Sequence, residues 1–241
     1  MQELDGIRIN KYLSSSGVCS RRNADILVSE GRVEVNGVKA APGMKVGPDD
    51  IITVNGKQIT VKNEKVVLAY YKSKGITVTE KDKFAQNKIS DVIKYPERVT
   101  YAGRLDKESE GLLILTNDGD LINRLTSPKY FHEKEYQVKI NKEVTPDFIK
   151  KMSSGIYLKE LNITTRPCVV NKTGKFTFNI VLTQGVNRQI RRMCKELNCY
   201  VTSLKRVRIA NILLANLKIG EFRKIEGIEL QALYNVIHKD C

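Results

Sequence analysis

Apolar residues near the N-terminus are spaced as on the buried face of a helix. The i, i+3, i+4 spacing and the break at Ser16-Gly17 predict one short helix. A second helix is predicted over residues 21–30, because the Ser20 hydroxyl can cap its first turn and Gly31 can end it. The residues expected to face the core of this region are Ile9, Tyr12, Leu13, Ala24, Leu27 and Val28.

The pattern then changes to alternation, which predicts strands. Residues 33–35 alternate up to Asn36-Gly37, a dipeptide typical of a tight hairpin, and residues 51–54 supply another strand. These helices and strands predict a small N-terminal domain, followed by a polar hairpin and linker over 55–64. The predicted division of the chain is therefore 1–60 and 61–241.

Residues 61–241 contain two kinds of strand pattern. Continuous apolar runs at 66–71 and 112–115 have the length of buried strands. Residues 132–140 and 175–182 alternate instead, as in strands with one buried face. The side chains expected to point inward on the alternating strands are Tyr136, Val138, Ile140, Phe176, Phe178, Ile180 and Leu182.

Helices are predicted between these strands. Helical spacing indicates helices over 82–94 and around 121–125, and Thr145-Pro146 is a typical helix start. Asn187 is the expected cap of a later helix. That helix would bury a stripe of Ile190, Met193, Cys194 and Leu197. Its arginines, Arg188, Arg191 and Arg192, would gather on a different face.

Charge points to a polyanionic partner. The chain of 241 residues is 41% apolar, enough for a real core, and carries 41 Lys and Arg against 27 Asp and Glu, a net charge of +14. Such an excess favours nucleic acid, with affinity that falls as salt rises. A membrane surface is the competing partner, but no apolar run approaches transmembrane length and no signal-peptide pattern opens the chain. We therefore expect no membrane association.

The cysteines and histidines do not indicate a metal site. The five cysteines are odd in number and scattered, which fits neither a disulfide framework nor a zinc site and predicts a reducing, cytoplasmic location. His132 and His238 lie far apart in the sequence. We expect no metal ion in the chemistry.

The string at residues 102–119, AGRLDKESEGLLILTNDG, carries the best candidate for chemistry. Asp106 lies between Arg104 and Lys107, on a turn fixed to the buried strand that follows. A lone aspartate in such a turn is more often part of a structural ion pair. The whole string, however, resembles the second signature of the pseudouridine synthases of the RsuA and RluB/RluE/RluF type, in which Gly-Arg-Leu-Asp carries the catalytic aspartate. The resemblance assigns that role to Asp106.

The N-terminal segment is similar to the alpha-L RNA-binding motif. The strings that carry the likeness are LSSSG at 13–17, SRR at 20–22 and EGRVEVNG at 30–37. Solvated surface charge is the alternative for any single arginine here, but the cluster favours RNA, which such a module would hold by shape and backbone. The cations expected to form one basic patch over the first turns are Arg8, Lys11, Arg21, Arg22 and Arg32.

Two further strings resemble the same synthase family. HEKEYQVKI at 132–140 matches its Lys-x-Tyr signature, in which the tyrosine ring packs against the target base, and this assigns Tyr136; taken alone, Tyr136 would more often be a core residue. RQIRR at 188–192 matches its Arg-x-Gln-Ile-Arg signature, whose second arginine pairs with the catalytic aspartate through its guanidinium fork, and this assigns Arg191. Residues expected to contact the RNA are Arg104, Lys107, Lys134, Arg188, Ile190 and Arg192.

The resemblance covers residues 7–225, is strongest to the RluF-like branch, and implies both fold and reaction. It implies an α+β chain: the small RNA-binding domain, then a catalytic domain with a mixed, mainly antiparallel sheet. The implied enzyme is an isomerase (an intramolecular transferase) that converts a specific uridine to pseudouridine and needs no cofactor. The uridine would be flipped out of its RNA, and Asp106 would either attack the ribose carbon or take a ribose proton.

Two other functions remain open on the residues alone. A non-catalytic RNA-binding or ribosome-assembly factor explains the charge, but it does not require Asp106, Tyr136 and Arg191 together. A nucleic-acid hydrolase with Asp106 as base would need metal ligands or a second placed carboxylate. We expect the substrate to be 23S ribosomal RNA of the large subunit, with transfer RNA as a further possibility, and the protein to be a monomer.

Overall fold

The computed structural model describes residues 6–60, 64–79 and 87–238. The chain forms two compact units. One consists of Met1–Lys65 with the short segments Pro96–Arg98 and Asn117–Gly119, and the other of the remaining residues. The domain boundary expected after residue 60 stays a prediction. It lies five residues before Lys65, where the first unit ends.

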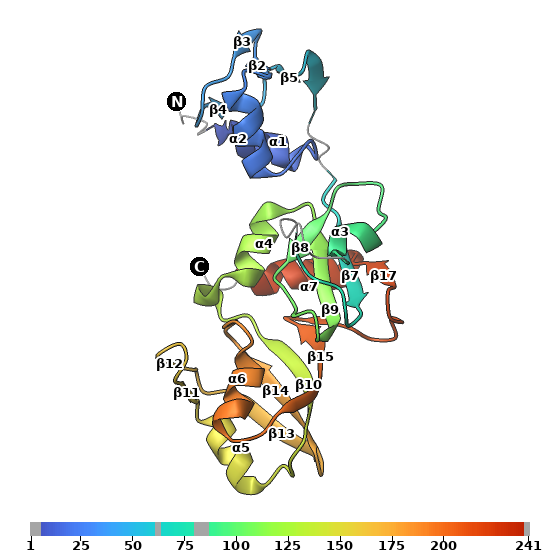
Figure 1. Cartoon of the computed structure of the whole chain (residues 1–241). Helices are drawn as coiled ribbons and strands as arrows, with labels where there is room; N and C mark the ends of the chain where they lie inside the picture. Colours follow the sequence, from blue (N-terminus) through green and yellow to red (C-terminus); the bar gives the residue numbers. More distant parts are fainter. Residues whose placement is uncertain (1–5, 61–63, 80–86, 239–241) are drawn as a thin grey trace. The chain divides into compact units, whose positions relative to one another are not determined.

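The N-terminal unit folds largely as its apolar pattern predicts (Figure 1). Ser20 caps the second helix by accepting a hydrogen bond from the Asn23 N–H at 3.3 Å, and Asn36 and Gly37 turn the hairpin with positive φ of 51° and 80°. Leu27 is only half-buried, and Ile51 is exposed and precedes its strand. The elements are β1 (Ile7–Arg8), α1 (Ile9–Ser15), α2 (Arg21–Ser29), β2 (Val33–Val35), β3 (Val38–Lys39), β4 (Lys45–Val46), β5 (Ile52–Val54) and β6 (Lys57–Ile59).

These elements enclose one small core. The strands β3, β2, β5 and β6 pair in that order, all antiparallel, and β1 pairs with β4. Ile9, Leu13, Ala24 and Val28 of the two helices pack with valines and isoleucines of the strands. A helix pair is thereby fixed on a short sheet, and its charged residues are left at the surface.

The second unit is built on one nine-stranded sheet. The order along it is β13-β14-β10-β15-β9-β7-β17, while β8 also pairs with β9 and β16 with β15. The strands are β7 (Val67–Lys72), β8 (Thr100–Ala102), β9 (Glu110–Thr116), β10 (Lys134–Ile140), β13 (Val169–Gly174), β14 (Thr177–Leu182), β15 (Val201–Ile209), β16 (Ile212–Leu213) and β17 (Phe222–Lys224), and a separate hairpin pairs β11 (Tyr157–Leu158) with β12 (Ile163–Thr164). The helices are α3 (Ile89–Val92), α4 (Gly119–Thr126), α5 (Pro146–Ser153), α6 (Gln189–Glu196) and α7 (Gly227–His238), with a 3-10 turn at Pro128–Tyr130.

The sheet has two halves joined by a short seam. Strand β15 pairs antiparallel with β10 over most of its length, but it meets β9 in parallel at only two registered pairs, Lys205 with Glu110 and Arg206 with Gly111. We call the part with β7, β8, β9 and β17 the first half, and the part with β10, β13 and β14 the second half. All other pairings in this sheet are antiparallel. The expected α+β architecture with a mixed, mainly antiparallel sheet is confirmed.

Each half has its own core. In the first half, Leu112 and Ile114 of β9 pack on one side of the sheet with α4 and α7, and Leu113 and Leu115 pack on the other side. The second half buries one face under α5 and α6. Figure 1 shows these two helices beside β14 and β13. Because β9 is buried on both faces, the turn that leads into it is anchored to a rigid element.

Two predictions about elements need correction. The helix expected over 82–94 is the four-residue α3 in its described part, and residues 82–86 lie outside the described residues. Phe176 was expected to point inward, but 39% of it is exposed. It precedes β14, in the turn from β13, where Lys175 Nζ lies 5.6 Å from its ring centre. The turn interrupts the alternation that the sequence pattern extended to this position.

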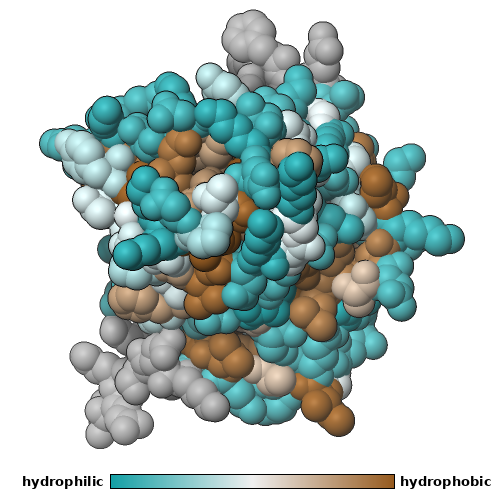
Figure 2. Space-filling model, turned by 90° about the horizontal axis from the view of Figure 1, so that it is seen from below, coloured by the Kyte–Doolittle hydropathy of each residue, from teal (hydrophilic) through white to brown (hydrophobic). Residues whose placement is uncertain are grey.

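Hydrophilic side chains break up the exposed apolar surface on the face shown in Figure 2. Among the described helices, none combines the length and the hydropathy that crossing a bilayer requires.

Candidate active site

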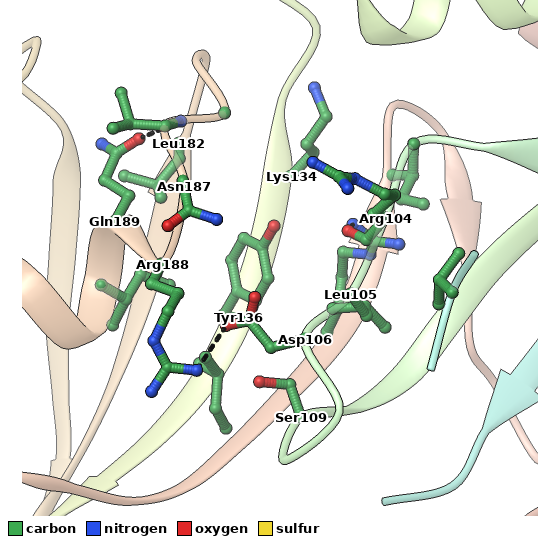
Figure 3. A pocket seen from close by; sticks show the side chains of 18 of the residues that line it. Arg104, Leu105, Asp106, Ser109, Lys134, Tyr136, Leu182, Asn187, Arg188 and Gln189 are labelled. Atoms are coloured by element: carbon green, nitrogen blue, oxygen red, sulfur yellow. Dashed lines mark hydrogen bonds and ion pairs between the residues drawn. The ribbon is translucent and has the colours of Figure 1, made fainter. Parts of the chain in front are cut away.

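A pocket of about 390 Å³ lies over the seam of the large sheet. Its floor comes from β10 and β15, which contribute Tyr136, Leu204 and Arg206. One wall is the segment 102–107 before β9, and the opposite wall is the segment 184–190 that leads into α6. Figure 3 shows Asp106 and Arg188 approaching each other from these two walls, with Tyr136 beside them. Segments far apart in the sequence therefore meet here.

Asp106 belongs to a short turn that the fold holds from below. Leu105 is 7% exposed and anchors the turn in the core, and the Ser109 N–H donates to the Asp106 carbonyl at 3.0 Å. The Asp106 side chain keeps 27% of its surface exposed. Its carboxylate can therefore reach a ligand in the pocket while its backbone stays fixed.

Arg191 approaches Asp106 with one nitrogen. Its Nε lies 3.8 Å from Asp106 Oδ2, an ion-pair distance longer than a hydrogen bond. Nη2 donates to Ser109 Oγ at 3.2 Å and to the Glu108 carbonyl at 3.3 Å, and Nη1 donates to the Val201 carbonyl at 3.4 Å. The sequence led us to expect a guanidinium fork on the carboxylate. In the structure only Nε lies near the carboxylate, while Nη2 bonds to the turn that carries Asp106 and Nη1 bonds to Val201.

Arg188 is the second cation at Asp106. Its Nη1 donates to Glu108 Oε2 at 2.7 Å and lies 3.9 Å from Asp106 Oδ2. The hydrogen bond from Arg188 lowers the pKa of Glu108, and the same bond raises the pKa of Arg188. Arg188 was expected on the RNA backbone. In this structure Glu108 holds it at the mouth of the pocket, within reach of the carboxylate.

The start of α6 differs from the prediction. Asn187 was expected to cap the helix, but the residue before its first turn is Arg188, whose φ is 53° and whose side chain does not cap. The Gln189 side chain instead fixes the chain that leads into the helix, because its Oε1 accepts a hydrogen bond from the Val186 N–H at 3.1 Å. The left-handed backbone at Arg188 aims its side chain at Glu108 and Asp106.

The three arginines of α6 do not share one place. Arg192 pairs with Glu160 and donates through Nε to the Asn187 carbonyl at 3.0 Å, and it does not line the pocket. Successive residues on a helix point about 100° apart, so Arg191 and Arg192 cannot serve the same carboxylate. None of the three arginines is buried with the stripe of Ile190, Met193 and Cys194, as expected, but only Arg188 and Arg191 approach Asp106. Ile190, in contrast, is 4% exposed and lines the pocket as an apolar wall.

Tyr136 and Lys134 follow each other along the pocket face of β10. Tyr136 is half-buried and packs against the cores of both halves of the sheet. Lys134, two residues earlier, donates from Nζ to the His132 carbonyl at 3.0 Å. Burial, and then the charge of Arg206, lower the pKa of Lys134 to about 8. Arg104 and Lys107 also line the pocket, with exposed side chains.

Two buried cations near the turn of Asp106 were missed in the sequence. Lys72, at the end of β7, is fully buried and donates to the Ser73 and Ser109 carbonyls, both at 2.8 Å. Burial lowers its pKa to about 8, against the opposing charge of Asp106. Arg206 is 2% exposed and lines the pocket. The alternation from Leu204 assigned position 206 to the inner face, so an arginine there was a usable signal.

The basic residues of the N-terminal unit come from several of its elements. Arg8, Arg21 and Arg22 are exposed, and the last two lie in the first turn of α2. Arg32 follows the opposite end of that helix, where Nη1 lies 3.0 Å from Glu30 and Nε donates to Asn55 Oδ1 at 2.8 Å. Lys11 is half-buried in α1. A common basic patch of these residues stays a prediction.

The pocket presents a fixed carboxylate between guanidinium groups, next to an aromatic ring and an apolar wall. Such a carboxylate can attack an electrophilic carbon or take a proton from a bound ligand. Within the described residues, His, Cys, Asp and Glu side chains form no group of three that could hold a metal ion. The reactive groups of this pocket are the Asp106 carboxylate and the cations around it.

Comparison with known families supports both units. A family model described as RNA pseudouridylate synthase matches residues 66–196. A second one, described as S4 domain, matches residues 7–52. The first spans all the pocket walls and both Tyr136 and Arg191, and the second spans the paired helices with Arg21 and Arg22.

Individual proteins match over nearly the whole chain. The dual-specificity RNA pseudouridine synthase RluF of Escherichia coli (strain K12) is 42% identical over 233 residues, which are 96% of this chain and 79% of that protein. The ribosomal large subunit pseudouridine synthase B of Bacillus subtilis (strain 168) is 34% identical over 94% of this chain and 95% of its own length. A crystal structure of a pseudouridylate synthase superposes with a TM-score of 0.70 at 26% identity, over 94% of this chain and 99% of that one.

Proposed function

The chain belongs to the RNA pseudouridylate synthase family and carries an S4 domain, and on that premise we propose that it isomerises a uridine of large-subunit ribosomal RNA with Asp106 as the catalytic carboxylate. Members of this family are isomerases that act on RNA. Asp106, its partners and the RNA target are the proposed parts. We also keep the division at residue 60, a cytoplasmic location and a monomeric state as predictions.

The observation that carries the proposal is the position of Asp106. Its carboxylate lies in a pocket within 4 Å of two guanidinium groups, Arg191 at 3.8 Å and Arg188 at 3.9 Å. The ring of Tyr136 lines the same pocket. Binding of RNA alone requires no carboxylate at the centre of a basic pocket, since a carboxylate repels phosphate. A catalytic role explains its presence.

The proposed reaction uses these groups in turn. A uridine leaves its stack, at a cost of roughly a few kcal/mol, and its base packs on the ring of Tyr136. Arg104, exposed on the wall of the pocket, contacts the RNA that the uridine leaves. Ionised Asp106, held by Arg191, either attacks the ribose carbon or takes a ribose proton, and the bond from ribose to the uracil nitrogen breaks. The detached base turns in the pocket and rejoins the ribose through a ring carbon.

We propose ribosomal RNA as the target because of the relatives. The Bacillus subtilis relative is named for the large ribosomal subunit, and the Escherichia coli relative is called dual-specificity. Transfer RNA is the second substrate class that we propose to test. The S4 domain would position the RNA through its phosphates, with Arg21 and Arg22 at a helix N-terminus.

The test of Asp106 separates chemistry from binding. Asp106→Asn keeps the shape of the side chain and removes its charge, so we expect unchanged RNA affinity and no pseudouridine, measured by filter binding and by nucleoside analysis of a 23S transcript. Asp147→Asn is the matched control, because Asp147 is exposed on α5 and pairs only with Lys151 among the interactions described. Substantial product from Asp106→Asn would refute the assignment.

The target is tested in cells. Pseudouridines are mapped in the ribosomal and transfer RNA of cells with and without this protein. We expect one large-subunit site to be lost with the protein and to return with the wild-type chain but not with Asp106→Asn. A loss confined to transfer RNA would overturn the ribosomal target and leave the reaction standing.

A further inference from the structure

Arg206 is a buried cation without a carboxylate partner. Its Nε donates to the Leu112 carbonyl at 2.7 Å and its Nη1 to the Arg104 carbonyl at 3.4 Å. Nη2 is buried and has no hydrogen-bond partner, and no described carboxylate lies within ion-pair distance of the guanidinium. Buried arginines are normally paired, and an unsatisfied charged donor is costly. Because Arg206 lines the pocket, its positive charge lies close to a ligand bound there, although the Nη2 atom itself is buried.

Lys134 adds a second cation on the same face of the sheet. Arg206 on β15 is the registered neighbour of Tyr136 on β10, and Lys134 lies two residues before Tyr136. Registered neighbours and residues two apart point to the same side of a sheet. Arg206 and Lys134 therefore flank the tyrosine ring, one across the sheet and one along the strand, and all three line the pocket.

Resting on the proposed function, we propose that Arg206 and Lys134 form a subsite for the negative charge on the oxygens of the detached uracil ring. When the bond between ribose C1′ and uracil N1 breaks, both electrons stay with the ring, and the negative charge spreads over N1, O2 and O4. Carbon C5 then forms the new bond to C1′, as Asp106 either leaves C1′ or returns the ribose proton. Afterwards C5 loses its proton and N1 takes one up. The ring is neutral before and after these steps, so a cation pair beside it stabilises the intermediate more than the substrate.

The depth of the subsite favours the base over an RNA phosphate. The proposed base platform is Tyr136, which is the registered neighbour of Arg206 and lines the same pocket. Arg206 is 98% buried beneath the turn that carries Arg104. A phosphate remains in the continuous backbone of the RNA, for which the exposed Arg104 and Lys107 at the wall are the nearer cations.

The test separates rate from affinity. In a single turnover with excess enzyme, a 23S transcript labelled with tritium at uracil C5 releases tritium as the new bond forms. We expect Lys134→Met to slow this release about 100-fold with RNA affinity unchanged within about twofold, and Lys134→Arg to recover most of the rate. Arg206→Gln, which removes the other positive charge of the pair, should slow the release in the same way.

A control variant shows the effect of losing one lysine charge outside the pocket. Lys139→Met removes a lysine from the same strand, but Lys139 is exposed and does not line the pocket, so its rate should equal that of the wild type. Lys134→Met could instead bind RNA more weakly, with a salt dependence reduced by about one ion, and keep its single-turnover rate. That result would assign Lys134 to a phosphate and overturn the proposal. Equal rates for Lys134→Met and the wild type would also overturn it.

A second substrate tests the charge on the ring itself. Fluorine at C5 stabilises the uracil anion. With a transcript that contains 5-fluorouridine, the rate at which the intact nucleoside disappears should therefore differ less between wild type and Lys134→Met, by a factor at least tenfold smaller. An unchanged difference would contradict the subsite. If Asp106→Asn were active, the proposed function would fail first. If it is inactive while Lys134→Met is fully active, only the subsite fails.

Discussion

Three cations hold the turn that carries Asp106. Lys72 donates to the Ser109 carbonyl, Arg191 to the Ser109 hydroxyl and the Glu108 carbonyl, and Arg206 to the Arg104 carbonyl. Each bond reaches the backbone or side chain of a residue within three positions of the carboxylate. The orientation of Asp106 is thus fixed by charge-assisted hydrogen bonds to its own turn, as well as by the ion pairs that it makes directly.

Arg191→Lys should slow isomerisation about 100-fold with little change in RNA affinity. A lysine ammonium is a single point and cannot serve the Asp106 carboxylate, the Ser109 hydroxyl and the Val201 carbonyl, which the three nitrogens of Arg191 reach. A displacement of the carboxylate by about 1 Å accounts for a loss of this size. Single-turnover rates measure it. Arg192→Lys, on the same helix but paired with Glu160, is the control, and equal effects of the two variants would contradict the role of Arg191.

Burial of Lys72 makes stability depend on pH. Its pKa is lowered to about 8 from the ordinary 10.5, so below pH 8 it is charged in both states and the native state carries the cost of a buried charge. Between about pH 8 and 10.5 the native protein releases this proton first, and the free energy of unfolding rises with pH. Lys134, with a pKa lowered to about 8, acts in the same sense.

Lys72→Met should reduce that rise. Urea unfolding of wild type and variant at about pH 7 and about pH 9.5 measures the difference, and the variant should gain less stability between the two than the wild type. The loss of two hydrogen bonds to carbonyls lowers the stability of the variant at both pH values, so the comparison is between slopes. Parallel pH profiles would show that Lys72 is not the group that titrates.

At the level of elements, the seam between β9 and β15 depends on a glycine. Gly111 has φ of +113°, and a Cβ built on it would lie 2.2 Å from the Arg206 carbonyl oxygen and 2.6 Å from its nitrogen. Backbone cannot move aside as a flexible side chain can. The close approach of the two strands is possible only because this position has no side chain.

Gly111→Ala should therefore destabilise the protein by roughly 2–4 kcal/mol, from the strained φ and from separation of the strands. Urea titration measures the loss. Gly185→Ala is the control for stability, because nothing lies within 4 Å of its added Cβ and no positive φ is involved. If the two variants unfold alike, the contact with the Arg206 backbone does not limit the seam.

The elements were predictable to the extent that local pattern determines them. The helices at Arg21–Ser29 and Pro146–Ser153 begin at the expected caps, Ser20 and Thr145, and β9 is the buried run that the sequence indicated. The start of α6 was not predictable in the same way. It begins after a left-handed Arg188, whose side chain bonds to Glu108, eighty positions away. Local spacing carries no information about such a partner.

The site shows the same limit. Family resemblance indicated Asp106, Tyr136 and Arg191, and the fold brings Asp106 and Arg191 to 3.8 Å. Lys72 and Arg206 were missed because a lysine or arginine in a strand is normally read as a surface residue. For Arg206 the alternation from Leu204 was a signal of burial, whereas the burial of Lys72 follows from how the strands pack in the sheet.

At the level of the whole second unit, the groups proposed for catalysis come from opposite sides of the seam. Asp106 belongs to the first half, whereas Tyr136, Arg188 and Arg191 belong to the second half. Each half has its own core, Tyr136 packs against both, and the sheet itself connects the halves through two registered pairs between β9 and β15.

On heating, this protein should therefore lose its activity before it unfolds. A slight parting of the two halves would draw the acid away from its partners while every helix and strand stayed intact. Activity assayed along a temperature ramp should fade several degrees below the loss of far-ultraviolet circular dichroism, and cooling should restore it at once. If activity and circular dichroism are lost at the same temperature, the two halves do not separate before they unfold.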